Sequence, residues 1–108
     1  MIGKEPTLEK RETADQKLVR LLKEKGSEDP EARKFLNDWT KEQERAIEQL
    51  SDYVLGQIQL NLRRARLYFQ AGYVDAALEN FEAAGTQAWN LHNDELYQAI
   101  MREMDELQ

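Results

Sequence analysis

The sequence predicts an all-α fold, a small helical bundle of antiparallel hairpins built around one long central helix. Apolar residues recur every three or four positions along most of the chain, which is the period of an amphipathic helix. The two prolines, Pro6 and Pro30, both lie where a helix would begin, so they interrupt none. Five glycines and almost no alternation of β-branched with polar residues leave little room for strands. Residues 1–6 are expected to be a disordered lead and residues 7–108 a single domain with one modest core.

The first helix is expected within residues 7–25. It begins either at the start of that range or at Thr13, because Thr13 followed by Gln16 is a capping box. In that motif each of the two side chains bonds to the backbone N–H of the other residue. Gly26 then fits the left-handed residue that commonly ends a helix.

The start of the second helix is the clearest boundary signal in the chain. Asp29 can cap a helix, and Pro30 suits the first helical position, where an N–H would have no partner anyway. From there an unbroken spacing predicts one helix over residues 30–71. The alternative is a bend near Ser51–Asp52 or at Gly56. At about 1.5 Å per residue a single helix would be about 60 Å long, so it would overhang its neighbours or bind another chain.

Gly72 breaks this periodicity and precedes a C-terminal helical hairpin over residues 73–107. The first helix of the hairpin is expected from Val74 to Leu91, and Asn93 caps the second. The two residues after Asn93 are acidic and fall in the first turn, where the helix dipole favours anions.

The residues on both sides of Gly72, within residues 58–92, follow a pattern of small and aromatic side chains. The pattern is Ala65-x-x-Tyr68-x-x-x-Gly72-x-x-x-x-Ala77-x-x-x-Phe81-x-x-Ala84. It resembles the helix–turn–helix of a tetratricopeptide repeat, in which small residues let two helices approach closely and aromatic residues fill the space between them. It is also similar to the three-helix microtubule-interacting-and-trafficking domain. The first resemblance implies a tetratricopeptide-repeat-like C-terminal half and a binding groove.

The same resemblance implies a binding site on the helix that precedes Gly72. The face of this helix towards the concave groove would carry Arg63, Arg66, Phe69 and Gln70. Arginines in such a groove bind an acidic peptide or a C-terminal carboxylate through charge-assisted hydrogen bonds. The alternative is that they neutralise neighbouring acidic residues of this chain, such as Glu79, Glu82 or Glu103.

Phe35 and Trp39 are the second set of candidate partner-binding residues. They lie on the half of the long helix that the C-terminal hairpin is too short to cover. The first helix offers only Leu18, Leu21 and Leu22 as cover. An exposed apolar patch usually marks an interface, so a symmetric homodimer centred on Phe35 and Trp39 is expected, with packing on the first helix as the alternative. Core packing is the default for both tryptophans, but Trp39 is the better candidate anchor than Trp89.

No residue pattern indicates catalysis. His92 is the only histidine and the sequence contains no cysteine, whereas transition-metal sites commonly use several of either. No glycine-rich phosphate loop, nucleophile elbow or paired-histidine helix occurs. We therefore expect no enzyme activity, no cofactor and no metal, and we expect His92 to bond free carbonyls at the end of a helix.

Charge and hydropathy narrow the range of partners. The net charge of −6 disfavours a nucleic-acid partner, which requires a basic surface. No apolar run approaches the roughly 20 residues of a membrane span, so a cytoplasmic protein without a membrane partner is expected. The expected function is a non-enzymatic helical protein–protein interaction module that binds an acidic peptide or a partner helix. The alternative is a structural homo-oligomer formed through the long helix.

Overall fold

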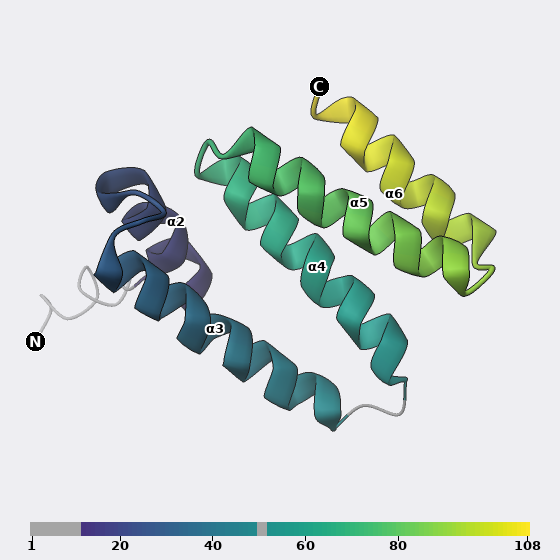
Figure 1. Cartoon of the computed structure of the whole chain (residues 1–108), viewed down its shortest axis with the longest axis horizontal. Helices are drawn as coiled ribbons and strands as arrows, with labels where there is room; N and C mark the ends of the chain where they lie inside the picture. The colour runs from purple at the N-terminus through teal and green to yellow at the C-terminus, as the bar shows by residue number, and fades with distance from the viewer. Residues whose placement is uncertain (1–11, 50–51) are drawn as a thin grey trace, which may run out of the picture.

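The computed structural model describes residues 12–49 and 52–108, and within these ranges the chain folds into five α-helices and no strand (Figure 1). The helices are α2 (Ala14–Lys25), α3 (Pro30–Glu48), α4 (Tyr53–Gln70), α5 (Val74–Asn90) and α6 (Asp94–Glu106). The predicted all-α class and small helical bundle are confirmed. The predicted disordered lead, residues 1–6, lies outside the described residues, as does any start of the first helix before residue 12.

α4 is the central element of the fold. It packs against α2 and α3 on one side and against α5 on the other (Figure 1). α6 packs against α5 and ends at the C-terminus. From α3 to α6, consecutive helices run antiparallel and lie side by side, so their spatial order follows their order in the chain.

The predicted single helix over residues 30–71 is wrong, because α3 ends at Glu48 and α4 begins at Tyr53. The Asp52 side chain accepts a hydrogen bond from the backbone N–H of Leu55 at 3.0 Å, which caps the start of α4. The alternative of a break near Ser51–Asp52 is confirmed. The apolar periodicity continues in phase across the break, so it cannot distinguish one long helix from two shorter ones. A turn between α3 and α4 is favoured because it buries the apolar faces of both helices in one core.

α2 and α3 begin at the caps that the sequence predicts. The Thr13 hydroxyl accepts a hydrogen bond from the Gln16 N–H, and the Gln16 side chain accepts one from the Thr13 N–H, each at 3.0 Å. The Asp29 carboxylate accepts hydrogen bonds from the N–H groups of Glu31 and Ala32, at 2.9 and 3.0 Å. These donors have no acceptor inside a helix, so the caps determine where α2 and α3 start.

Two apolar cores share α4. The first core joins α2, α3 and α4 through Leu18, Leu21, Leu22, Ala32, Trp39, Ile47, Leu60, Leu67 and Ala71. The second core joins α4, α5 and α6 through Ile58, Leu62, Ala65, Phe81, Ala84, Ala88 and Ile100. Ala65, Ala77 and Ala84 are fully buried, which agrees with the predicted close approach of α4 and α5 at small residues.

The α4–α5 and α5–α6 turns share one backbone motif. In each turn the first N–H bonds to the carbonyl three residues back, and the next N–H bonds to the carbonyl five residues back. These two donors are Gly72 and Tyr73 in the first turn, and His92 and Asn93 in the second. The left-handed residue is Gly72 (φ 93°) in one turn and His92 (φ 59°) in the other. The bond at His92 is made by its backbone, so the expectation that the histidine side chain bonds free carbonyls stays a prediction.

Candidate functional site

Arg66, a predicted partner-binding residue on α4, is bonded within the chain. Its Nε and one terminal nitrogen donate to the two carboxylate oxygens of Glu103 on α6, at 2.7 and 2.9 Å. The hydrogen bond from Arg66 lowers the pKa of Glu103, and the same bond raises the pKa of Arg66. The alternative that this arginine neutralises a neighbouring acidic residue is confirmed for Glu103. The guanidinium group of Arg66 is therefore already bound to Glu103, and this ion pair holds α6 to α4.

Arg63 is the arginine of this group that is least engaged. It donates to the Gln43 side chain of α3, and no carboxylate of the described residues lies within ion-pair distance of it. Arg64 is partly buried and donates to side chains on α4 and α5. Arg63, Arg66 and Gln70 lie on one exposed face of α4, whereas Phe69 beside them is partly buried. The structure thus brings three of the four predicted groove residues together on the surface.

The predicted exposed patch at Phe35 and Trp39 is wrong. Trp39 is only 4% exposed, and its indole N–H donates to a carboxylate oxygen of Asp15 on α2 at 2.9 Å. Phe35 is partly buried against the same core, with the Lys17 ammonium 5.1 Å from its ring centroid. Because the chain turns back after α3, α2 and α4 together cover this stripe. Phe35 and Trp39 therefore do not form the exposed apolar surface on which the expected dimer depended.

Trp89 is the exposed tryptophan instead. Its side chain is 60% exposed, more than any other large apolar side chain among the described residues. Its ring meets that of Tyr97 on α6 edge to face, with centroids 5.1 Å apart. Helical spacing alone does not reveal this exposure. Trp89 lies one turn after the buried Gly85, so the pattern is the same whether Trp89 is buried or exposed.

Trp89 stands at one end of a hollow of about 550 Å³ between α5 and α6. We call this hollow the α5–α6 groove, and it is lined by Glu82, Gly85, Thr86, Trp89, Tyr97, Met101 and Met104. Gly85 is buried, and a Cβ atom at this position would lie 2.7 Å from the terminal methyl carbon of Met101. The missing side chain therefore lets Met101 rest against α5. Methionine side chains are flexible and polarisable, which suits a surface that adapts to a partner.

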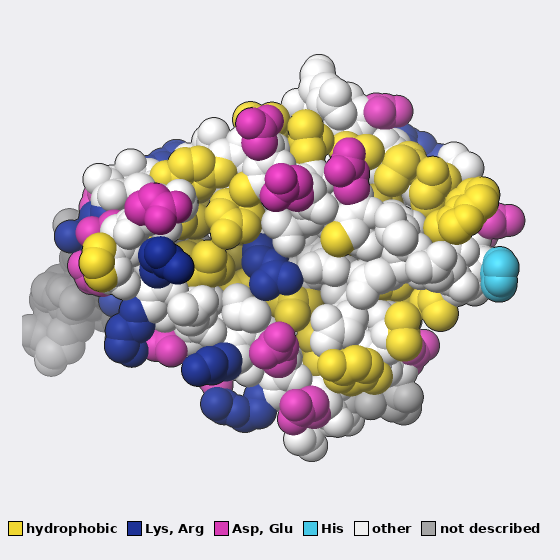
Figure 2. All heavy atoms as spheres, in the orientation of Figure 1, with side chains coloured by type: hydrophobic (Ala, Val, Ile, Leu, Met, Phe, Trp, Pro, Cys, Tyr) yellow, Lys and Arg dark blue, Asp and Glu magenta, His cyan; other side chains and the backbone are white. Residues whose placement is uncertain are grey.

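Acidic side chains lie at one end of the α5–α6 groove. Glu82 belongs to its lining, and Asp105 directly follows the lining residue Met104 on α6, one turn from Met101. Figure 2 shows hydrophobic and acidic side chains over the part of the molecule where α5 meets α6, whereas Lys and Arg side chains concentrate over α2, α3 and the adjoining part of α4. The groove is therefore mostly apolar inside and negatively charged at the end where Glu82 and Asp105 lie.

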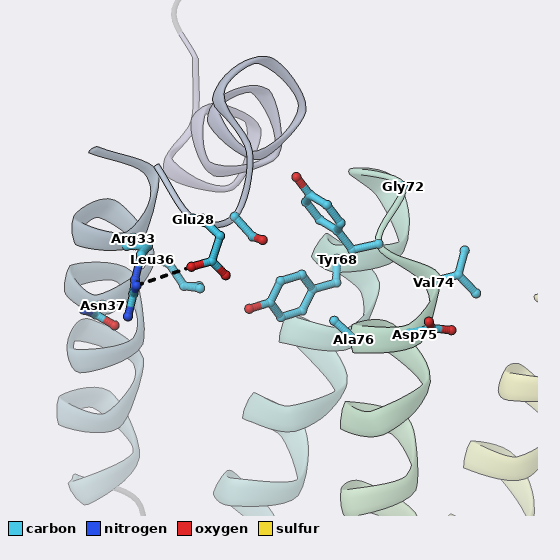
Figure 3. Close-up of a pocket in the computed structure, with 11 residues that line it drawn as sticks. Glu28, Arg33, Leu36, Asn37, Tyr68, Gly72, Val74, Asp75 and Ala76 are labelled. Carbon is cyan, nitrogen blue, oxygen red and sulfur yellow. Dashed lines mark ion pairs between the residues drawn. The ribbon is translucent and has the colours of Figure 1, made fainter. Parts of the chain in front are cut away.

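A second hollow, of about 730 Å³, separates the α2–α3 loop and α3 from the α4–α5 turn (Figure 3). Tyr68 points into it from α4, facing Leu36 and the ion pair of Arg33 with Glu28, whose charged atoms are 3.6 Å apart. Burial raises the pKa of Tyr68, so its phenol stays a neutral hydrogen-bonding group. The lining thus offers the hydroxyls of Ser27 and Tyr68 and an exposed ion pair, while the Tyr73 hydroxyl already donates to the Leu22 carbonyl.

The described residues contain no group of three side chains that could hold a metal ion. His92 is exposed at the α5–α6 turn. Within the same residues no helix combines the length and apolar character that crossing a membrane requires. Comparison with known proteins finds no matching family model, no matching curated protein and no matching solved structure.

Proposed function

We propose that this chain is a non-enzymatic helical protein–protein interaction module that receives a partner helix in the α5–α6 groove. The observation that carries the proposal is the exposure of Trp89 beside Tyr97 and two methionines. An exposed tryptophan is unfavourable in water, and it is among the side chains that contribute most binding energy at protein interfaces. Its edge-to-face contact with Tyr97 holds the ring in place before a partner arrives, which reduces the entropy lost on binding.

The dimensions of the groove suit a helix. From Glu82 to Trp89 the α5 wall is two turns long, or about 10 Å at 1.5 Å per residue. A helix laid between α5 and α6 would place residues i, i+4 and i+7 of its apolar face against Trp89, Met101 and Met104. The notch at Gly85 lets Met101 shift when an apolar side chain enters.

The resemblance to a tetratricopeptide repeat also supports a binding surface between α5 and α6. In a tetratricopeptide-repeat arrangement α4 and α5 would form one repeat, and α6 would take the place of the first helix of the next repeat. A partner helix in the α5–α6 groove would pack against both helices and cover the exposed Trp89.

A second candidate site is the exposed face of α4, for an acidic peptide. The observation that favours it is Arg63, which has no carboxylate partner among the described residues and lies near Gln70 on the same face. Arg66 contributes less than the sequence suggests, because binding a peptide there requires its bidentate bond to Glu103 to open.

The proposal is tested by comparing the proteins that associate with wild-type chain and with three single variants in cells that express it naturally. Trp89→Glu places a charge in the groove, and Val74→Glu is the matched control at an exposed apolar position of the same helix. Arg63→Glu tests the α4 face. We expect one partner to associate with the wild type, Val74→Glu and Arg63→Glu but not with Trp89→Glu. The proposal fails if Trp89→Glu, shown to be folded by circular dichroism, retains every partner.

A further inference from the structure

We infer that the helix received by the α5–α6 groove is amphipathic and positively charged, with Lys or Arg on both sides of its apolar face. This inference rests on the proposed function and adds the chemistry of the partner. Its basis is the charge around the groove. Glu82 lies in the lining on the α5 side, and Asp105 directly follows the lining residue Met104 on the α6 side.

Few cations on the two helices are available to offset these acidic side chains. α5 carries no Lys or Arg. The one arginine of α6, Arg102, lines a different hollow together with Asp94 of the same helix. His92 is exposed at the turn that joins the helices, next to Asn93. A neutral or basic groove edge would accept many partners, whereas this edge favours basic ones and repels acidic ones.

The acidic side chains lie towards one end of the groove. Because α5 and α6 run antiparallel (Figure 1), Glu82 lies towards the end where Met104 and Asp105 stand. A bound helix of two to three turns would therefore meet one carboxylate from α5 and one from α6 near one of its ends. Lys and Arg side chains are long enough to reach these carboxylates while the apolar residues fill the groove.

The same charges disfavour two other occupants. A two-fold dimer through this groove would place Glu82 and Asp105 of one copy against the same acidic surface of the other. Like charges brought together at an interface destabilise it. An anionic lipid surface meets the same repulsion. Charge complementarity thus selects a basic partner helix over a second copy or a membrane.

The experiment uses the full chain and two synthetic peptides of about 15 residues that differ only in charge. Both peptides carry Leu at positions i, i+3, i+4 and i+7 of each two-turn unit, and the remaining positions are Lys and Ala in one and Glu and Ala in the other. Binding is followed by calorimetry and by the indole N–H resonances in a heteronuclear NMR spectrum. The two tryptophans separate the surfaces, because Trp89 lines the groove and Trp39 is buried in the other core.

We expect the Lys peptide to shift the Trp89 resonance but not that of Trp39, and to bind about tenfold more tightly than the Glu peptide at low salt. The preference for the Lys peptide should decrease as salt increases. Glu82→Lys combined with Asp105→Lys should reverse the preference. Glu44→Lys combined with Glu48→Lys changes the net charge equally on exposed positions of α3, and it should leave the preference intact.

Three outcomes would overturn the inference. If the Glu peptide shifts Trp89 at equal or lower concentration, the groove binds a helix but the partner is not basic, and the proposed function survives. If the α3 control variant loses the preference as much as the groove variant, the preference reflects net charge alone. If neither peptide shifts Trp89 while dilution of the protein or addition of phosphatidylserine vesicles does, the occupant is a second copy or a membrane, and the proposed function fails as well.

Discussion

At the scale of single residues, the two turns that flank α5 provide an internal comparison. Both use the same pair of backbone hydrogen bonds, and both need one residue in the left-handed region. Glycine adopts that region without a steric penalty, whereas a residue with a Cβ is strained there. Gly72 occupies the position in one turn and His92 in the other. The α5–α6 turn, next to the proposed groove, is therefore the more strained of the two.

We predict that His92→Gly stabilises the protein by about 0.5–1 kcal/mol, because it removes the left-handed strain at an exposed position. Gly72→Ala is the reciprocal change and should destabilise by about 1 kcal/mol. No atom lies within 4 Å of a Cβ built at Gly72, so the cost is conformational rather than steric. Urea denaturation measures both values. Equal effects of the same sign in the two variants would contradict this account.

At the scale of helices, the boundary between α3 and α4 depends on a cap that the apolar periodicity conceals. Asp52 stands outside the helix and accepts a hydrogen bond from the Leu55 N–H. An aspartate at this position opposes continuation of a helix, since its short side chain competes for backbone N–H groups. The bond therefore identifies the residue at which α4 starts.

Asp52→Ala should destabilise the protein by about 1 kcal/mol, the usual effect of removing a cap. The sign of the effect is informative. In the interior of one continuous helix the same substitution would stabilise, because alanine has the higher helix propensity. Urea denaturation of the variant, with the exposed helix-interior change Asp38→Ala as the control, distinguishes the two cases.

The attachment of α6 to α4 includes the bidentate pair of Arg66 with Glu103. The hydrogen bond from Arg66 lowers the pKa of Glu103 in the folded state. A group with a lowered folded pKa stabilises the protein above its unfolded pKa, and this contribution is lost as pH falls through the folded value. The position of α6, and with it the shape of the groove, therefore depends on Glu103 being ionised.

We predict that Glu103→Gln lowers the free energy of unfolding at neutral pH by about 0.5–1 kcal/mol, a small value because both side chains are partly exposed. The difference from wild type should shrink below about pH 4, where glutamate in the unfolded chain is protonated, and disappear once Glu103 is protonated in the fold. Denaturation at neutral and acidic pH measures the difference. A gap that stays constant on acidification would show that the charge of Glu103 does not stabilise the fold.

At the scale of the whole molecule, α4 couples two cores that otherwise have no helix in common. Leu60 and Leu67 of α4 face α2 and α3, while Ile58, Leu62 and Ala65 face α5 and α6. Loss of either core exposes one side of α4. The two halves are therefore expected to unfold together. Each half also contains one tryptophan, which allows this coupling to be measured.

Trp89→Phe leaves Trp39 as the reporter of the first core, and Trp39→Phe leaves Trp89 as the reporter of the contact between α5 and α6. In each variant we predict that the fluorescence transition in urea coincides with the loss of helical circular dichroism, as two-state unfolding requires. Trp39→Phe should also shift the midpoint to lower urea, because it removes the hydrogen bond to Asp15. Separate transitions for fluorescence and circular dichroism would show that the cores unfold independently.

The sequence by itself determined the features that depend on neighbouring residues. The caps at Thr13 and Asp29 and the end of a helix before Gly72 follow from local geometry, because each involves residues within a few positions of one another. The buried alanines of α4 and α5 follow from helical periodicity. The pairing of Arg66 with Glu103 was one of several alternatives that the charge pattern left open.

Only the tertiary structure decided which apolar residues are covered. The stripe through Trp39 and the side chain of Trp89 both satisfy helical spacing, yet Trp39 is buried and Trp89 is exposed. The difference arises because the chain turns back between α3 and α4, which brings α2 and α4 over Trp39, whereas none of the described helices covers Trp89. Periodicity records which face of a helix is apolar, but burial depends on whether another helix reaches that face.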